Sequence, residues 1–271
     1  IFSPFSDEFP IHRHRSLCYN KNMTDSLLKA GERIDQLFSS NIKIIQNKDV
    51  FSFSVDSVLL SRFPNIPAKK GLIVDLCSGN GAVGLFVAGQ TKAQIIQVEL
   101  QERLADMNQR SILLNELEKQ VSVIQDDLAN LANHVGLSKF DFMFCNPHYF
   151  KVDEGSNLNE SEHYLLARHE IATNLDAICQ VAQQTLKTNG RLAMVHRPDR
   201  FFDILDTLRR YKLAPKRIQF VYPKPGKEAN MLLVEAIRDG SLAGLKILPP
   251  LFVHQDNGDY TDEIREIYYG K

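Results

Sequence analysis

Short apolar runs alternate with amphipathic stretches along most of this chain. Apolar runs bounded by turn residues predict strands over 71–76, 94–98, 121–124, 140–145 and 190–196. Apolar residues at helical spacing predict helices over 24–38, 55–63, 82–90, 101–114, 161–170, 175–186 and 201–211. The run over 140–145 is unbroken after Asp141, which is typical of a parallel strand covered on both faces.

Two antiparallel pairs stand outside this alternation. We expect a small hairpin from residues 42–45 and 50–53, and a terminal hairpin from 216–222 and 230–237 across a loop containing Pro223. Repeated strand–helix units that end in an antiparallel pair predict a doubly wound α/β sheet with helices on both faces.

The chain divides into three parts by pattern. Residues 1–22 lack periodicity, and we expect a disordered or non-native N-terminal extension there. Residues 23–63 form a predicted helix, hairpin and helix, and 64–271 form the main α/β domain. No positively charged segment followed by an apolar run and a cleavage site opens the chain, so we do not expect a signal peptide.

Composition narrows the class of protein. The 271 residues carry 32 Lys and Arg against 33 Asp and Glu, so the chain is not a polycation built to coat nucleic acid. No apolar run approaches the ~20 residues of a membrane span. The four cysteines form no C-x-x-C pair, so we expect neither a structural zinc site nor a disulfide framework, and a reducing cytoplasm fits best.

A glycine-rich turn follows the first long strand. Gly79, Gly81 and Gly84 satisfy G-x-G-x-x-G, and Glu99 follows about 20 residues later at the end of the next strand. Glycines there let the backbone approach a ligand, and the helix start presents N–H groups to polar or anionic atoms. On that spacing alone, a nicotinamide dinucleotide is a candidate.

Asp75 changes the balance between cofactors. Its carboxylate precedes the first glycine by four residues and would repel a pyrophosphate, whereas it suits the cationic ammonium of an amino acid. D-x-x-x-G-x-G with an acid after the second strand is typical of S-adenosylmethionine sites, in which Glu99 would accept from the ribose hydroxyls. A structural turn and the dinucleotide remain the alternatives.

An acidic pair, Asp126-Asp127, follows the third predicted strand. In the S-adenosylmethionine pattern an acid here accepts from the adenine amino group, and Asp127 is the better match. The alternative is a solvated turn or a helix cap.

The fourth strand ends in Cys145-Asn146-Pro147-His148-Tyr149-Phe150. This sequence resembles the N-P-P-[YFW] motif of methyltransferases that act on planar nitrogens. The lone pair of an adenine amino group is delocalised, so the group is a poor nucleophile. The Asn146 side-chain oxygen and the Pro147 carbonyl would accept from its N–H bonds, favour a pyramidal nitrogen and stabilise the developing positive charge.

The remaining motif residues would handle the base. Tyr149 would stack on an adenine turned out of its own stack into the pocket. His148 stands where a second proline is expected, which restores an N–H and frees one φ angle. The two acceptors come from Asn146 and Pro147, so the chemistry does not need the missing proline.

From about Arg33 to Gly270 the chain resembles the bacterial tRNA(Val) adenine-37 N6-methyltransferases. The resemblance rests on segments 51–60, 74–81, 99–103, 146–150, 167–170 and 219–233. It implies a class I S-adenosylmethionine-dependent methyltransferase, Rossmann-like, with a seven-stranded, mostly parallel sheet. It also implies a target adenine beside the anticodon, and therefore the tRNA anticodon stem-loop as partner.

The resulting site has three groups of residues and no metal. We expect catalysis by Asn146, Pro147 and Tyr149. The cofactor-binding residues are Asp75, Gly79, Asn80, Gly81, Glu99, Leu100, Asp127 and Asn146. The substrate-binding residues are His148, Tyr149, Phe150, Arg168, Lys224 and Lys227.

The charge of the C-terminal half bears on the substrate. Residues 187–246 contain thirteen Lys and Arg against six acids, a net charge of +7, and Lys224 and Lys227 lie in one loop. Such a segment suits phosphate contacts, although a solvated helix face would also account for many of these charges. A protein glutamine N5-methyltransferase and a non-catalytic S-adenosylmethionine- or RNA-binding protein remain alternatives, and a monomer is favoured.

Overall fold

A nine-stranded sheet forms the centre of the computed structural model, which describes residues 27–50, 54–147 and 175–270. Its strands are β3 (Leu72–Leu76), β4 (Gln94–Glu99), β5 (Val121–Gln125), β6 (Phe140–Cys145), β7 (Leu186–His196), β8 (Leu213–Tyr222), β9 (Met231–Arg238), β10 (Lys246–Ile247) and β11 (Leu251–Phe252). Their order is β10-β8-β9-β7-β6-β3-β4-β5, with β11 also paired to β8.

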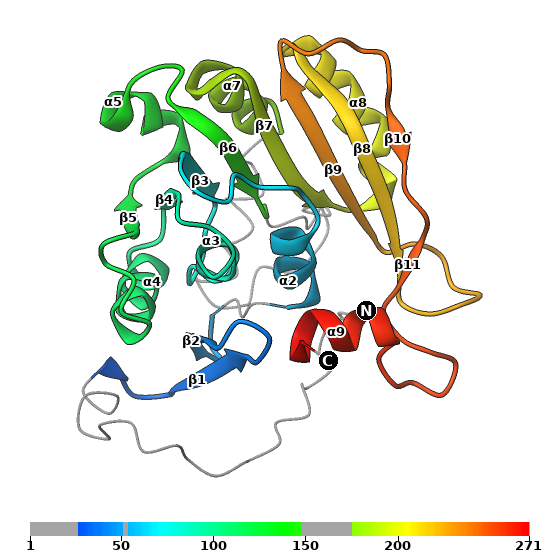
Figure 1. Cartoon of the computed structure of the whole chain (residues 1–271). Helices are drawn as coiled ribbons and strands as arrows, with labels where there is room; N and C mark the ends of the chain where they lie inside the picture. Colours follow the sequence, from blue (N-terminus) through cyan, green and yellow to red (C-terminus); the bar gives the residue numbers. More distant parts are fainter. Residues whose placement is uncertain (1–26, 51–53, 148–174, 271) are drawn as a thin grey trace, which may run out of the picture.

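Seven principal strands give the expected topology (Figure 1). Five neighbouring strands, in the sheet order β5, β4, β3, β6 and β7, pair in parallel. Strand β9 lies between β7 and β8 and runs antiparallel to both. The class I methyltransferase fold is therefore confirmed, with its terminal antiparallel pair. The two-residue strands β10 and β11 extend the β8 edge and were not predicted.

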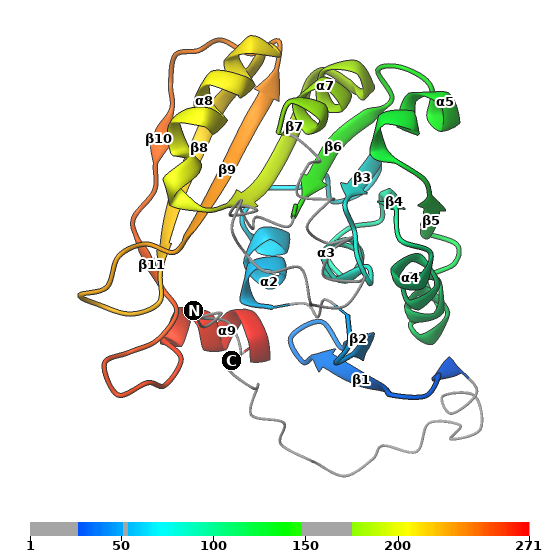
Figure 2. The same ribbon diagram turned by 180° about the vertical axis from the view of Figure 1, so that it is seen from behind.

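Helices cover both faces of the sheet (Figures 1 and 2). They are α2 (Val55–Arg62), α3 (Ala82–Ala88), α4 (Glu102–Leu114), α5 (Leu131–Val135), α7 (Leu175–Thr185), α8 (Phe201–Arg210) and α9 (Asp262–Tyr269). One apolar layer joins the sheet to α2, α3, α4 and α9, and a second joins it to α5, α7 and α8. In the described part of the chain, no helix is long and apolar enough to cross a bilayer.

The N-terminal helix prediction is wrong at its end. Residues Glu32–Leu37 form a strand, β1, rather than the end of a helix over 24–38. That strand pairs with β2 (Ile42–Asn47), a pairing that was not predicted, and most of the predicted partner, 51–53, lies outside the described residues. Gly31, at φ +79°, turns the chain just before β1, and hairpin pairing with β2 overrides the weak helical pattern.

Other predicted elements fare better. Helices over 55–63, 82–90, 101–114, 175–186 and 201–211 are confirmed to within a few residues. The predicted helix over 161–170 and the extension over 1–22 lie outside the described residues. The strand expected over 190–196 begins earlier, at Leu186, and α5 and α9 were not predicted.

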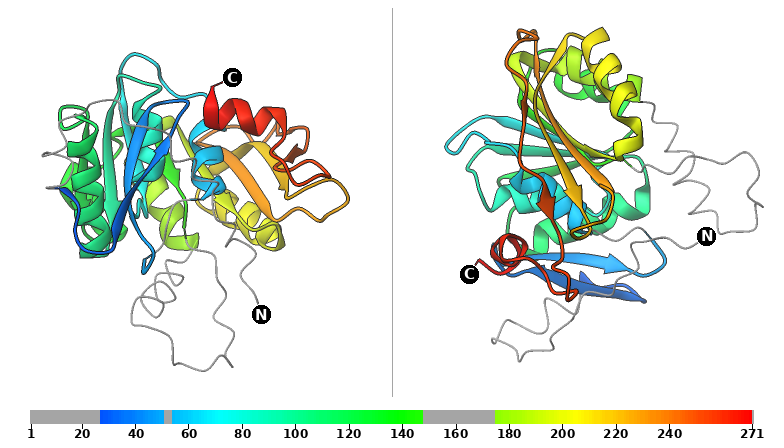
Figure 3. Two further views of the ribbon diagram at one scale, coloured as in Figure 1. Left: turned by 90° about the horizontal axis from the view of Figure 1, so that it is seen from below. Right: turned by 90° about the vertical axis from the view of Figure 1, so that its right-hand side faces the viewer.

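The parallel strands all end at one edge of the sheet, and several segments gather there. Viewed from below that edge, β1, β2, α2 and α9 lie across it (Figure 3). Because β8 runs in the same direction as β7, the loop that follows Tyr222 leaves from this edge too. Residues distant in sequence are thereby brought to the carboxyl ends of β3, β4 and β6.

Candidate active site

The loop between β3 and α3 is held by left-handed backbone and close packing. Cys77, Gly79 and Gly81 have φ angles of 54°, 56° and 88°. A Cβ at Gly81 would lie 2.3 Å from Oδ1 of Asn108 on α4, so this position requires glycine. A Cβ at Gly79 would meet no described atom within 4 Å, so the loop borders open space there.

The third glycine of the motif packs against the sheet. A Cβ at Gly84 would lie 2.4 Å from Nε2 of Gln97, which points up from the neighbouring strand β4. The same Gln97 nitrogen donates to the Gly81 carbonyl at 2.9 Å. Gly84 therefore allows α3 to approach the sheet closely. The glycine motif thus serves helix packing as well as forming a turn that can face a ligand.

Asp75 is completely buried beneath this loop. Its Oδ2 accepts from the Gly84 N–H at 2.9 Å and from Gln97 Nε2 at 3.3 Å, while its Oδ1 has no hydrogen-bond partner among the described residues. Burial raises the pKa of Asp75 from 3.8 to about 7, and those two donors offset only part of the rise. A nearby cation would stabilise the charged form.

Glu99 ties the glycine loop to the start of α4. Its Oε2 accepts from the Gly79 N–H at 2.7 Å, and its Oε1 accepts from the Gln101 N–H at 2.9 Å. The residue is only 3% exposed. Each carboxylate oxygen can accept more than one hydrogen bond, so this position, at the carboxyl end of β4 beside Gly79, also suits a ligand diol.

The acidic pair after β5 divides into two roles. Asp126 accepts from the Asp127 N–H, from Asn130 and from His134 at 2.7–2.8 Å, and these donors lower its pKa to about 2. Asp127 is exposed and caps a short 3-10 helix by accepting from the Ala129 N–H at 2.9 Å. Asp127, the predicted cofactor residue, is therefore the more accessible of the two.

Asn146 follows β6 and faces the start of α2. Its side-chain nitrogen, Nδ2, lies 3.1 Å from Ser57 Oγ and 3.4 Å from Asp56 Oδ2. Pro147 beside it is buried. Asp56 and Ser57 have no role predicted from the sequence, although both lie in the segment 51–60 that contributes to the family resemblance.

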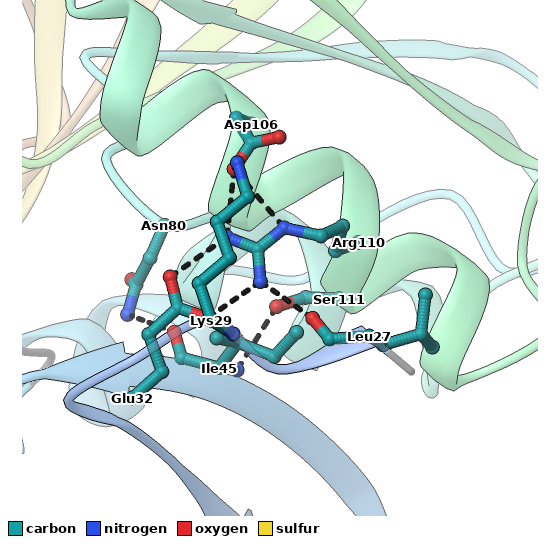
Figure 4. Close-up of polar contacts among 8 residues, drawn as sticks. All are labelled: Leu27, Lys29, Glu32, Ile45, Asn80, Asp106, Arg110 and Ser111. Atoms are coloured by element: carbon teal, nitrogen blue, oxygen red, sulfur yellow. Dashed lines mark hydrogen bonds and ion pairs between the residues drawn. The ribbon is translucent and has the colours of Figure 1, made fainter. Parts of the chain in front are cut away.

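Asn80 connects the glycine loop to the N-terminal hairpin. Its Nδ2 donates to the Ile45 carbonyl at 3.2 Å, and the Ile45 N–H donates to Ser111 Oγ of α4 at 3.0 Å (Figure 4). The side chain of this predicted cofactor residue therefore holds β2 against the loop. Sequence reasoning missed Ser111, because nothing in the pattern of α4 reveals a hydrogen bond to residue 45.

An ion cluster fixes the same hairpin to α4 (Figure 4). Arg110 Nη2 lies 2.8 Å from Glu32 Oε1 and 2.7 Å from Asp106 Oδ2, and Lys29 Nζ lies 2.7 Å from Asp106. The Glu32 and Arg110 side chains are 3% and 11% exposed. The donated hydrogen bonds of Arg110 are the main cause that holds the pKa of Glu32 below its usual value.

The other predicted residues fall into two sets. Leu100 is 47% exposed beside Glu99, and Lys224 and Lys227 lie on the loop after β8, at the carboxyl edge of the sheet. Four more lie outside the described residues: His148, Tyr149, Phe150 and Arg168.

The described residues fit the expected cofactor. Among the described residues, Asp75 has one unpartnered oxygen and would be stabilised in its charged form by a ligand cation, and open space borders Gly79. Glu99 and Asp127 offer acceptors after the next two strands. Two acidic side chains bonded to the glycine segment, with a third at the end of the next strand, would disfavour a pyrophosphate, so the arrangement suits S-adenosylmethionine better than a dinucleotide.

Comparison with known sequences relates this chain to methyltransferases. A family model described as "Methyltransferase small domain" matches residues 41–211. A tRNA1(Val) (adenine(37)-N6)-methyltransferase from Porphyromonas gingivalis is 24% identical over 77% of this chain and 83% of its own. An enzyme of the same name from a Shewanella species is 25% identical over 79% of this chain and 89% of its own.

Solved structures share the fold. A predicted O-methyltransferase from Agrobacterium tumefaciens superposes with a TM-score of 0.62, at 22% identity over 80% of this chain and 96% of its own. A geranyl diphosphate C-methyltransferase from Streptomyces coelicolor, in complex with S-adenosyl-L-homocysteine, gives a TM-score of 0.51 at 12% identity over 67% and 74% of the two chains. At such identities the likeness concerns the fold alone.

Proposed function

The chain belongs to the methyltransferase small domain family, and from this premise we propose that it methylates N6 of an adenine in tRNA with S-adenosylmethionine as donor. The proposed target is position 37, beside the anticodon, presented by the anticodon stem-loop. Curated relatives that span most of the chain carry the name of this activity. A tRNA substrate would place the enzyme in the cytoplasm.

One observation carries the proposal: the acceptor motif and the glycine loop leave neighbouring strands at the same edge. β3 and β6 pair in parallel, with Leu76 opposite Cys145. Asn146 and Cys77 are the next residues along each strand, so the residue that would hold the amino group lies beside the loop that would hold the methyl donor.

Acidic groups would hold the cofactor. We assign the ribose hydroxyls to Glu99 and the adenine amino group to Asp127, with the exposed Leu100 against the adenine ring. Buried Asp75 would act at a distance, through its negative potential on the ammonium of the methionine moiety. The bound cofactor supplies an electrophilic methyl group on a sulfonium ion.

The chain's own part in the chemistry is to orient the acceptor nitrogen and to stabilise its charge. Asn146 Oδ1 and the Pro147 carbonyl would accept from the two N–H bonds of the adenine amino group. A pyramidal nitrogen with its lone pair exposed is favoured, and positive charge on it is stabilised as the new bond forms. Fixed alignment contributes further acceleration. A proton can leave the nitrogen after transfer, so no strong general base is needed.

The surroundings of the base and the RNA complete the proposal. We assign stacking on the adenine to Tyr149, with His148, Phe150 and Arg168 nearby in the substrate region. Lys224 and Lys227 would contact phosphates of the stem-loop, because their loop leaves the sheet at the edge where Asn146 lies.

The test is transfer of a radiolabelled methyl group from S-adenosylmethionine to unmodified tRNA, bulk protein and DNA offered in parallel. We expect label in tRNA, and nucleoside analysis should identify the product as N6-methyladenosine. The Asn146→Ala variant serves as the control for contaminating activity.

Two results would replace the proposal with its alternatives. Label only in protein would favour a glutamine N5-methyltransferase, whose planar amide nitrogen suits the same two acceptors. Binding of S-adenosylmethionine without transfer to any of the three substrates would favour a non-catalytic binding protein.

A further inference from the structure

The start of α2 packs against the side chain of Asn146, ninety residues away in sequence. Asn146 Nδ2 lies 3.1 Å from Ser57 Oγ and 3.4 Å from Asp56 Oδ2. Ser57 is 3% exposed, and Asp56 and Asn146 are half-buried, so these contacts are partly shielded from water. Hydrogen bonds are electrostatically stronger there than in water.

Asp56 is itself held in place by its own helix turn. Its Oδ1 accepts from the Ser57 N–H at 2.8 Å and from the hydroxyl of Ser54. The carboxylate therefore cannot swing freely, and its other oxygen stays directed at Asn146. An acid in the first turn is also stabilised by the partial positive charge at the helix N-terminus.

This arrangement fixes which way the Asn146 amide points. A carboxylate only accepts hydrogen bonds, so the amide nitrogen must face Asp56, and the amide oxygen lies on the opposite side of the planar group. The flipped amide would bring oxygen against oxygen. Donation to an anion also polarises the amide, which makes Oδ1 a better acceptor.

We propose that Asp56 and Ser57 are positioning residues that turn Asn146 Oδ1 toward the acceptor amino group and strengthen it as an acceptor. This inference rests on the proposed function and deepens it. The negative charge of Asp56 would act through Asn146 on the nitrogen that becomes positive during transfer. Neither residue needs to touch the cofactor or the base.

The kinetic test uses Asp56→Asn and Ser57→Ala in the full chain with unmodified tRNA. We expect kcat to fall about 10- to 100-fold, the scale of a small misplacement at a reacting centre, with little change in KM for tRNA or Kd for S-adenosylmethionine. Asp56→Glu, which keeps the charge, should recover part of kcat. A general structural defect would instead raise KM and Kd and lower the melting temperature.

A matched control is available at the other end of the chain. Asp262 occupies the first turn of α9 and its side chain is 94% exposed, so Asp262→Asn makes the same chemical change at a helix start where the carboxylate faces solvent. It should leave kcat unchanged. An unchanged kcat in Asp56→Asn, or an equal fall in Asp262→Asn, would overturn the positioning role.

A spectroscopic readout separates this inference from the proposed function. The side-chain NH2 signal of Asn146 in a nitrogen–proton correlation spectrum is identified by its loss in Asn146→Ala. We expect that signal to move in Asp56→Asn and to stay in place in Asp262→Asn. An unmoved signal in Asp56→Asn overturns the positioning role, whereas wild-type protein that does not methylate RNA overturns the proposed function alone.

Discussion

Replacing Asp75 by asparagine should stabilise the protein more at high pH than at low pH. Asp75 is fully buried, and burial raises its pKa from 3.8 to about 7. The unfolded chain ionises this carboxyl near pH 3.8, whereas the folded chain resists ionisation until about pH 7. Stability therefore falls as pH rises between these two values.

The magnitude follows from the two pKa values. Each pKa unit of difference is worth about 1.4 kcal/mol, so ionisation of Asp75 destabilises the fold by about 2 kcal/mol at pH 5 and about 4 kcal/mol at pH 8. The asparagine variant does not ionise, so it avoids this loss of stability. Its NH2 group, however, takes the place of Asp75 Oδ1, which has no described partner, and this unsatisfied donor lowers the stability by about 1–3 kcal/mol at any pH. The variant's advantage should therefore grow by about 2–3 kcal/mol from pH 5 to pH 8.

The assay is urea denaturation of both proteins at pH 5 and pH 8, without cofactor. The change with pH in the stability difference between variant and wild type does not contain the cost of the unsatisfied NH2, because that cost is the same at both pH values. The same variant should bind S-adenosylmethionine more weakly by calorimetry, because the negative potential at the site is lost. A stability difference that stays constant between pH 5 and pH 8 would show that Asp75 is not a strained buried acid.

Other predictions concern the cofactor, the RNA and the hairpin. Glu99→Gln should weaken S-adenosylmethionine binding about tenfold or more by calorimetry, because one acceptor oxygen is lost; unchanged affinity would refute the ribose assignment. Lys224→Gln combined with Lys227→Gln should weaken tRNA binding and lower the slope of log K against log salt by about 1 for each lost phosphate contact; an unaltered slope would remove both lysines from the RNA surface. Arg110→Met should cost about 3 kcal/mol in urea denaturation, because it leaves the buried Glu32 carboxylate without its charged partner, with only the Lys29 N–H among the described residues still donating to it. Since the pKa of Glu32 is lowered, this contribution should be present above pH 4.5 and fade as pH falls through the lowered value, and a wild-type advantage that persists in acid would contradict it.

Much of the sheet could be predicted from the sequence because its strands are short, continuous apolar runs. Parallel strands buried on both faces leave a strong local signal, as in β6. The glycine loop and Asn146 could each be placed after a predicted strand, whereas their adjacency follows from the parallel pairing of β3 with β6. The glycine-rich turn could also be predicted from its motif. The structure supports each glycine of it, because residues 79, 81 and 84 lie where backbone geometry or close packing favours glycine.

The misses depend on pairing and tertiary contacts that leave no clear local pattern. β1 has no clean alternation, and its hairpin pairing with β2 across residues 38–41 defines it as a strand. The two-residue strands after β9 form only against β8. The contact of Asp56 with Asn146 spans ninety positions, and a polar residue at a helix start reads equally well as an ordinary cap.

The most direct test of the account is the single-turnover rate of N6-methyladenosine formation by Asn146→Ala at saturating S-adenosylmethionine and tRNA. If Asn146 Oδ1 stabilises the developing charge on nitrogen, the rate should fall by more than about tenfold, or ~1.4 kcal/mol of barrier, with the cofactor Kd unchanged. A rate within about tenfold of wild type would contradict the central role given to this side chain.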